Sequence, residues 1–301
     1  MSTDLEKIDY SLPQIGKTKW IGLMLTVFFL GIFIYFPITY KMKSILKESL
    51  SKIPGCPISY KEIGTEFFFP KLIITDLIVP MSCFNQYGDP ITLKKTNLNF
   101  RGLSFSPFGP HFMLETSVLK NNISAYLTAG FGSFAINIRE NRLDLKNLLK
   151  PVEKVKLTGS VLVDALIKVS NGEISDLKVN LISKDLGFPA QSIQGFKLYN
   201  LKLNNLLLKA QNNGKSLAIE NFIVGDANSP IRSSFKGNIK MNTKNVLMSQ
   251  VDLKGEAFFS KEFIEKYAFI KILMAKFNKK DDFYQIELKG PLSSPSTETS
   301  R

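Results

Sequence analysis

Few residues of this sequence have both the type and the spacing that catalysis or metal binding requires. Histidine occurs once, as His111 in the segment SPFGPHF, and cysteine occurs twice, as Cys56 and Cys83. Zinc sites built on several histidines or on four cysteines are excluded, because the chain has too few of these residues. A two-histidine proton relay is excluded because there is no second histidine. Proline and glycine breaks flank His111, which predicts a loop residue rather than a ligand.

The acidic residues complete no site either. The aspartates at positions 76, 144, 164, 226 and 252 are scattered, and none of the motifs G-x-S-x-G, H-E-x-x-H and G-x-x-x-x-G-K-[ST] occurs. Each of these motifs places a nucleophile, a pair of metal ligands or a phosphate cradle in a fixed local geometry. The sequence therefore predicts no enzyme, no catalytic or metal-binding residue and no cofactor.

The two cysteines leave two interpretations open. In an oxidising compartment, Cys56 and Cys83 can be joined by a disulfide, which stabilises by roughly 3 to 4 kcal/mol in the chain-entropy model. The alternative is two buried free thiols, because the sequence does not show whether the two Cβ atoms meet.

The composition predicts a folded, basic protein. Hydrophobic residues make up 44% of the chain and charged residues 22%, which excludes a disordered protein. Lys and Arg total 39 against 26 Asp and Glu, a net charge of +13. Such a surface can bind nucleic acid, anionic lipid headgroups or an acidic protein. The charge is dispersed, and aromatic residues are not interleaved with basic clusters, so a nucleic-acid partner is excluded.

An uncharged segment predicts a membrane anchor. Residues 20–40, WIGLMLTVFFLGIFIYFPITY, contain no charged side chain, and a helix of about this length crosses roughly 30 Å of hydrocarbon. Trp20 and Tyr40 lie where aromatic rings favour the headgroups, with Leu30 near mid-span. A cleaved signal peptide is disfavoured because no small-x-small cleavage site follows. We therefore predict a single transmembrane helix.

This anchor divides the chain into five predicted segments. They are a cytoplasmic tail (1–19), the transmembrane helix (20–40), a basic helical stem (41–54), a β-rich domain (55–290) and a disordered tail (291–301). Lysine counts do not orient the span, but a short polar tail before a long folded body favours translocation of the body. We expect a single-pass membrane protein whose body, in a bacterium, lies in the periplasm. The stem lysines either extend to the headgroups or recognise an anionic lipid.

Beyond residue 55 the hydrophobic period is two, which is typical of half-buried strands. Apolar residues alternate with polar ones in the segments 134–139, 177–181 and 284–289, and Asn212-Asn213-Gly214 is a hairpin signal. The apolar members predict one concave face that binds apolar groups, formed by Phe134, Ile136, Ile138, Leu177, Val179, Leu181, Ile286 and Leu288.

Glycine recurs inside these strands, at positions 159, 237, 255 and 290, each time two residues after an apolar one. Glycine within a strand often marks a bulge or bend that lets a sheet curl, although this pattern is also common in other β proteins. We predict a mainly β fold with a few helices. Its centre is a large curled antiparallel sheet, a half-barrel or groove, capped by one or two amphipathic helices.

Two helices are expected to interrupt the strands. The first lies near Arg142–Leu149, and the second covers Lys261–Phe277 with Ser260 as its N-cap. The second helix carries an apolar stripe that either caps the sheet or docks on a partner, formed by Phe263, Tyr267, Ile270, Met274 and Phe277.

Four segments carry a resemblance to a known family. They are GCPISYKEIGTEFFFPKLIITDLIVP (55–80), RLDLKNLLKP (142–151), GDANSPIRSSFKGNIKM (225–241) and YQIELKGPLSSP (284–295). Together with the order of tail, anchor and β-rich body, they resemble the bacterial GspN family, the N component of type II secretion systems, over nearly the whole chain. That family is similar in architecture to the AsmA-type envelope proteins, in which an anchor precedes a curled sheet with an apolar concave face.

Three functions compete. The resemblance implies a non-catalytic accessory or scaffold in the bacterial inner membrane, with its body in the periplasm and other type II secretion components as partners. This is the function we expect. The second is an AsmA-like lipid-handling protein whose apolar groove shields the acyl chains of phospholipid or lipopolysaccharide. The third, a membrane-tethered enzyme, is disfavoured by the missing motifs. An apolar face that the fold leaves uncovered would favour the second function.

Overall fold

The computed structural model describes most of the chain. The described residues are 17–51, 56–66, 71–84, 90–105, 107–118, 120–148, 156–171, 173–193, 196–212, 216–242 and 246–299. The helices are α1 (Lys17–Ser51), α2 (Leu145–Leu148), α3 (Lys261–Lys266) and α4 (Ala268–Met274), with 3-10 turns η1 (Met81–Phe84) and η2 (Val246–Met248). The strands are β1 (Glu62–Glu66), β2 (Lys71–Val79), β3 (Ile91–Phe105), β4 (Phe108–Val118), β5 (Asn121–Gly130), β6 (Ser133–Asp144), β7 (Ser160–Ser170), β8 (Glu173–Phe188), β9 (Gln191–Ile193), β10 (Phe196–Leu198), β11 (Leu201–Asn212), β12 (Leu217–Val224), β13 (Ile231–Lys240), β14 (Gln250–Phe259), β15 (Lys279–Lys280), β16 (Phe283–Pro291) and β17 (Ser296–Thr299).

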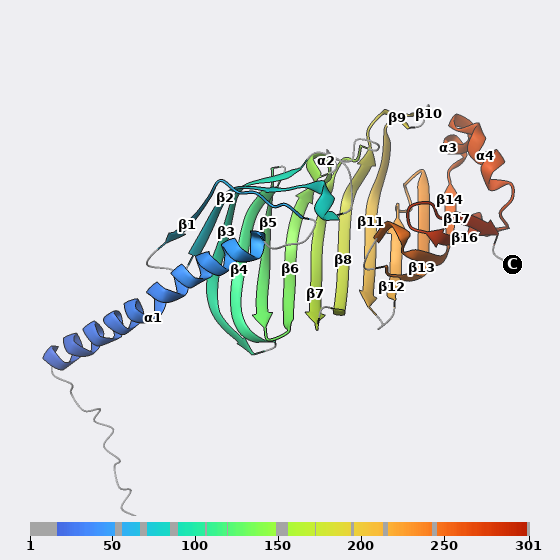
Figure 1. The fold of residues 1–301 in the computed structure, drawn as a ribbon. Helices are drawn as coiled ribbons and strands as arrows, with labels where there is room; N and C mark the ends of the chain where they lie inside the picture. The colour runs from blue at the N-terminus through green and yellow to red at the C-terminus, as the bar shows by residue number, and fades with distance from the viewer. Residues whose placement is uncertain are drawn as a thin grey trace, which may run out of the picture.

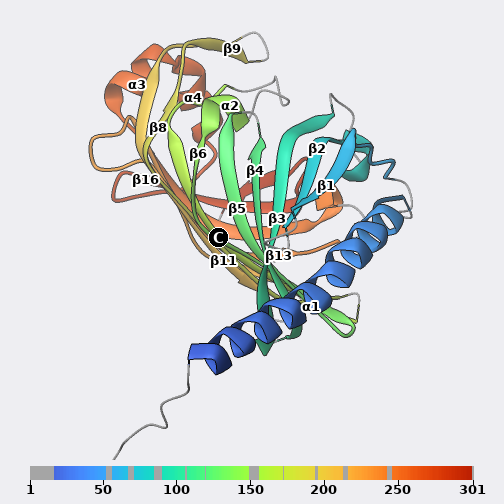
Figure 2. The same cartoon turned by 90° about the vertical axis from the view of Figure 1, so that its left-hand side faces the viewer.

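One antiparallel sheet of fifteen strands dominates the described structure. Its order is β1-β2-β3-β4-β5-β6-β7-β8-β11-β12-β13-β14-β16-β15, with β17 beside β16. Most strands pair with their neighbours in the sequence, as short hairpin connections require. Figures 1 and 2 show them side by side in one long twisted sheet. The prediction of a mainly β fold with a large antiparallel sheet is confirmed, and the curling of that sheet stays a prediction.

The two faces of the sheet differ in chemistry. Residues that are Cα partners across an antiparallel pair point to the same face, so the register assigns each side chain to a face. Leu72, Leu98, Leu114, Ala125 and Ile138 form one line of such partners from β2 to β6. We call their side the apolar face. The alternate residues of the same strands, which include many Lys, Asn, Ser and Glu residues, form the polar face.

Helices bury parts of the apolar face. Near β1 and β2, Leu46 of α1 packs against a buried cluster that contains Ile63 and Leu72. Near the other end, Phe263 and Tyr267 pack with Leu201 of β11. Two further clusters lie on β6 to β8 with β11 and on β11 to β16, and the short helix α2 contributes to the former.

Two of the recurring glycines lie where neighbouring strands come very close. A Cβ added to Gly237 (φ 147°) would lie 2.2 Å from the carbonyl oxygen of Asp252, and one added to Gly255 would lie 2.1 Å from that of Ser234. The register between β12 and β13 shifts after Ile219, the partner of Gly237. Irregular strand pairing of the kind predicted for these glycines therefore occurs next to Gly237.

The helix predicted over Lys261–Phe277 is two helices. Ser260 is the N-cap, since its hydroxyl accepts a hydrogen bond from the backbone N–H of Phe263 at 3.2 Å. At Tyr267 the backbone leaves the helical conformation (φ −127°, ψ 64°). The Tyr267 hydroxyl accepts a hydrogen bond from the backbone N–H of Tyr199 at 2.8 Å. A contact with a distant segment thus accompanies the break, and no local sequence pattern reports it.

Other local predictions need correction. The predicted disordered tail 291–301 is wrong for Ser296–Thr299, which pairs with β16, because strand pairing uses backbone groups and needs no apolar side chain. His111 lies in strand β4 rather than in a loop, and its Nδ1 is 2.9 Å from the Thr128 hydroxyl. The first predicted helix is a single turn that begins at Leu145, because Arg142 still pairs within the sheet.

Helix α1 runs unbroken from Lys17 to Ser51 and extends away from the sheet (Figures 1 and 2). Its large apolar side chains from Trp20 to Leu30 are each at least 50% exposed. Among the residues whose side chains the structure describes, no helix is long and apolar enough to cross a membrane. The transmembrane helix over residues 20–40 therefore stays a prediction.

Candidate functional site: the apolar face

The eight residues predicted from strand alternation all lie on the apolar face. Ile136 is connected to Leu177 through their common partner Ile167. The remaining members follow the same registers on β6, β8 and β16, and they are Phe134, Ile138, Val179, Leu181, Ile286 and Leu288. The eight residues thus share one face, although Ile286 and Leu288 on β16 lie seven strand positions from β6, and Ile286 belongs to a buried cluster.

A row of larger apolar side chains crosses the middle of this face. It runs over six successive strands, β3 to β8, and each member is the Cα partner of the next. We call it the central apolar row, formed by Phe100, Phe112, Leu127, Ile136, Ile167 and Leu177. Five strand spacings of about 4.8 Å give it a length of about 24 Å, more than the roughly 15 Å of hydrocarbon in one membrane leaflet.

The central apolar row is only partly covered. All six side chains are half-buried, and none belongs to any of the four buried clusters in the described part of the chain. The rings of Phe100 and Phe112 contact each other at a centroid distance of 5.7 Å. Phe134, on the same face beside the row, is 44% exposed. Among the described residues, this row therefore packs into no buried core of the kind that a β-sandwich has between its two sheets.

The predicted stripe on the C-terminal helices caps the sheet. Phe263 and Tyr267 are each 5% exposed and Phe277 is 6% exposed. Ile270 packs against the cluster of Phe263, and Met274 against that of Phe277. Of the two predicted roles, the structure shows capping. These buried side chains are not available for docking on a partner.

Three hollows outlined by described residues lie on the polar face. One of them has a volume of about 790 Å³ and is lined by side chains of both charges, among them Arg139, Lys178 and Asp164. Two smaller hollows are also mainly polar. The expectation that the apolar face is the concave one stays a prediction.

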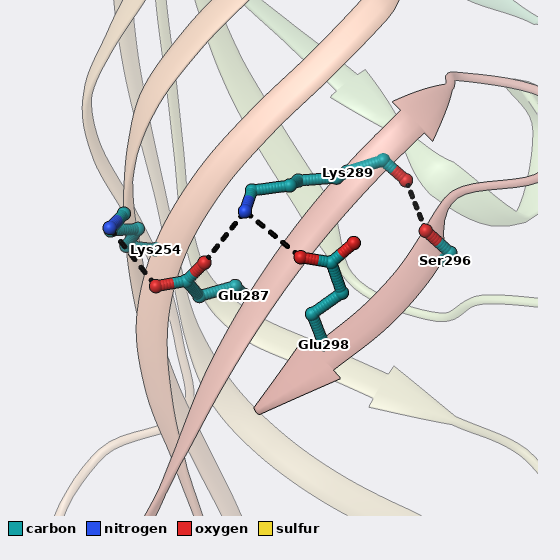
Figure 3. Close-up of polar contacts among 5 residues, drawn as sticks. All are labelled: Lys254, Glu287, Lys289, Ser296 and Glu298. Carbon is teal, nitrogen blue, oxygen red and sulfur yellow. Dashed lines mark hydrogen bonds and ion pairs between the residues drawn. The ribbon is translucent and has the colours of Figure 1, made fainter. Parts of the chain in front are cut away.

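A chain of ion pairs holds the C-terminal edge of the polar face together (Figure 3). The Glu287 carboxylate lies 3.0 Å from both Lys254 and Lys289, and Lys289 also lies 2.9 Å from Glu298. Hydrogen bonds from Lys254 and Lys289 hold the pKa of Glu287 below its usual value. Hydrogen bonds to Glu298 and Glu287 raise the pKa of Lys289. The four residues connect β14, β16 and β17, and they add side-chain contacts to the backbone pairing of the last strand.

Cys56 and Cys83 form a disulfide bond, with their Cα atoms 4.5 Å apart. The bond connects the segment that follows α1 to the turn η1 after β2. Of the two interpretations that the sequence leaves open, the structure shows the disulfide. The described residues contain no group of three or more His, Cys, Asp or Glu that could hold a metal ion.

Four of the six members of the central apolar row were not predicted from the sequence. They are Phe100, Phe112, Leu127 and Ile167. A signal existed for Phe100, since Leu98 and Phe100 alternate with asparagines at 97 and 99. Their common row depends on the register between strands, which alternation within one strand does not determine.

Comparison of the chain with protein-family models, with characterised proteins and with solved structures finds no match.

Proposed function

We propose that this is a non-catalytic protein anchored in the bacterial inner membrane. Its apolar face binds the acyl chains of a lipid, either phospholipid or lipopolysaccharide. One observation carries the proposal: the central apolar row crosses six strands and belongs to none of the buried clusters that the described residues form. Leaving such a surface in water is unfavourable at about 25 cal/mol per Å² of apolar area, and an acyl chain removes that area from water.

Membrane attachment is part of this proposal. The uncharged residues 20–40 lie within the continuous helix α1. None of the exposed side chains from Trp20 to Leu30 belongs to the clusters that the described residues form. A periplasmic body is supported by the disulfide between Cys56 and Cys83, since such bonds persist in oxidising compartments. The basic stem that follows the anchor suits anionic headgroups.

A matched pair of variants tests the lipid-binding face. Ile136→Asp places a carboxylate in the central apolar row, whereas Asn137→Asp places the same group one residue later on the polar face. The full-length protein is purified in detergent, and bound lipid is measured by mass spectrometry. We expect wild type and Asn137→Asp to carry lipid and Ile136→Asp to lose it. Equal lipid content in both variants, or none in wild type, would contradict the proposal.

A second measurement covers the case in which Ile136→Asp does not fold. A photo-reactive amino acid is placed at position 136 or at position 137 of the otherwise unchanged chain, and the protein is irradiated in native membranes. Position 136 should crosslink to lipid and position 137 should not. Crosslinking to protein alone at position 136 would reject lipid binding at this face.

The second candidate function is an accessory role in type II secretion. It is favoured by the resemblance to the GspN family of segments such as GDANSPIRSSFKGNIKM, part of which forms β13. A deletion strain separates the two candidates. Loss of exported folded enzymes with unchanged envelope lipids would support the secretion role, and changed envelope lipids with normal secretion would support lipid handling.

A further inference from the structure

The turns of three hairpins gather at one edge of the sheet. The backbone N–H of Asn171, in the β7–β8 turn, donates a hydrogen bond to the carbonyl of Gly132, in the β5–β6 turn, at 2.8 Å. A Cβ added to Gly130 would lie 3.2 Å from the carbonyl oxygen of Phe108, next to the β3–β4 turn. The three turns therefore form one continuous surface, at the lower edge of the sheet in Figures 1 and 2.

Large apolar side chains are unusually exposed on this surface. Phe131 is 95% exposed, Phe105 88%, Leu103 62% and Phe108 56%. Phe105 and Phe108 are Cα partners, with ring centroids 6.4 Å apart. We call this group, together with Phe134, the hairpin edge. Soluble proteins seldom leave clustered aromatic rings in water unless another surface covers them.

The two turns that carry these exposed side chains lack charge. The segments 102–114 and 121–138, which form the β3–β4 and β5–β6 turns and the strands next to them, contain no Asp, Glu, Lys or Arg, in a chain that is 22% charged. The β7–β8 hairpin beside them is charged, with Glu173 at its turn and an ion pair between Lys168 and Asp176. Charged residues are expensive to bring into a bilayer, whereas aromatic rings favour the level of the headgroups. An acidic or basic protein partner would need the complementary charge that this edge does not carry.

Two further features point towards the membrane. Leu103 and Phe134 belong to the apolar face, so this face extends to the hairpin edge. The N-terminal half of α1, whose side chains from Trp20 to Leu30 are exposed, runs towards the same lower side of the molecule in both views (Figures 1 and 2). One bilayer is then able to receive both the helix and the edge.

We propose that the hairpin edge is a second membrane contact: Phe105, Phe108 and Phe131 insert into the interface of the bilayer that holds α1, so that the apolar face opens onto lipid. This inference rests on the proposed membrane attachment, and it specifies which edge of the sheet contacts the lipid. Interfacial apolar groups enter about 5 to 10 Å into the boundary between headgroups and acyl chains.

Tryptophan fluorescence tests this contact, because Trp20 is the single tryptophan of the chain. In a Trp20→Phe background, one variant carries Phe131→Trp at the hairpin edge. The control carries Tyr199→Trp. Tyr199 is a 51% exposed aromatic residue next to α3, at the edge of the sheet opposite the hairpin edge. The full-length variants are reconstituted into phosphatidylcholine and phosphatidylglycerol vesicles, with and without acyl chains brominated near the headgroup. We expect loss of emission from position 131 and unchanged emission from position 199.

The outcomes distinguish this inference from membrane attachment itself. If native Trp20 is quenched and position 131 is not, the anchor stands and the hairpin edge does not touch lipid, which overturns the inference. If neither is quenched, membrane attachment fails as well. A third outcome is that emission from position 131 is unaffected by bromination and changes only with the protein-to-lipid ratio in unbrominated vesicles. That result would show contacts between copies of the chain at the hairpin edge, and it would also overturn the inference.

Discussion

Removal of the disulfide should release the segment after α1 from the edge of the sheet. The bond joins Cys56 and Cys83 across a sequence separation of 27. In the chain-entropy model, a loop of about 28 residues contributes about 3.6 kcal/mol at 25 °C. If β1 and β2 open as a local unit, this free energy corresponds to an increase of several hundred-fold, roughly, in their amide exchange rate.

Hydrogen exchange with mass spectrometry measures this effect on the full-length protein in detergent micelles. Wild type is compared with and without reductant, and both are compared with the variant Cys56→Ser, Cys83→Ser. We expect faster exchange over β1 and β2 in the reduced protein and in the variant, with little change in β13 and β14. The variant should not respond to reductant. Equal exchange of reduced and oxidised wild type would refute the reasoning.

Three further predictions concern stability. Because the pKa of Glu287 is lowered in the folded state, its stabilisation is present above the ordinary carboxyl pKa of 4.5 and is lost as the pH falls through the lowered value. The urea midpoint of Glu287→Gln should therefore decrease less between neutral and acid pH than that of wild type, and equal decreases would contradict this. Gly237→Ala should destabilise by about 1 to 3 kcal/mol in urea unfolding, whereas Gly64→Ala, whose added Cβ would have its nearest neighbour at 3.9 Å, should have little effect. Ser260→Ala should lower stability by about 1 kcal/mol through loss of the N-cap. Ser260→Asp should largely retain the stability of wild type when both variants are compared by thermal unfolding. Equal losses of stability in the two variants would exclude capping as the cause.

Local patterns predicted the side-chain composition of the faces well. Alternation with a period of two placed Ile136 and Asn137 on opposite faces, and this is a property of any extended strand. The N-cap at Ser260 was also readable, because capping depends on a few consecutive residues. The recurrence of glycine at 237 predicted an irregular position, although not the close approach of the Asp252 carbonyl that requires it.

Properties that depend on distant contacts were not readable. The break at Tyr267 accompanies a hydrogen bond from Tyr199. Strand β17 pairs with β16 through backbone groups, and an ion pair between Lys289 and Glu298 adds to this pairing. The exposed rings at the hairpin edge lie in two separate hairpins, β3–β4 and β5–β6, so no single segment of sequence shows that they meet.

The sequence by itself determined which side chains alternate along each strand, the uncharged segment 20–40 and the absence of familiar catalytic motifs. These follow from residue types at short spacing. Only the tertiary structure decided that Cys56 meets Cys83, that the stripe of Phe263 is buried, and that Phe100 and Leu177 end one apolar row across six strands. The reason is physical: strand register and side-chain burial arise from pairing between segments far apart in the chain, and each segment alone is compatible with several registers.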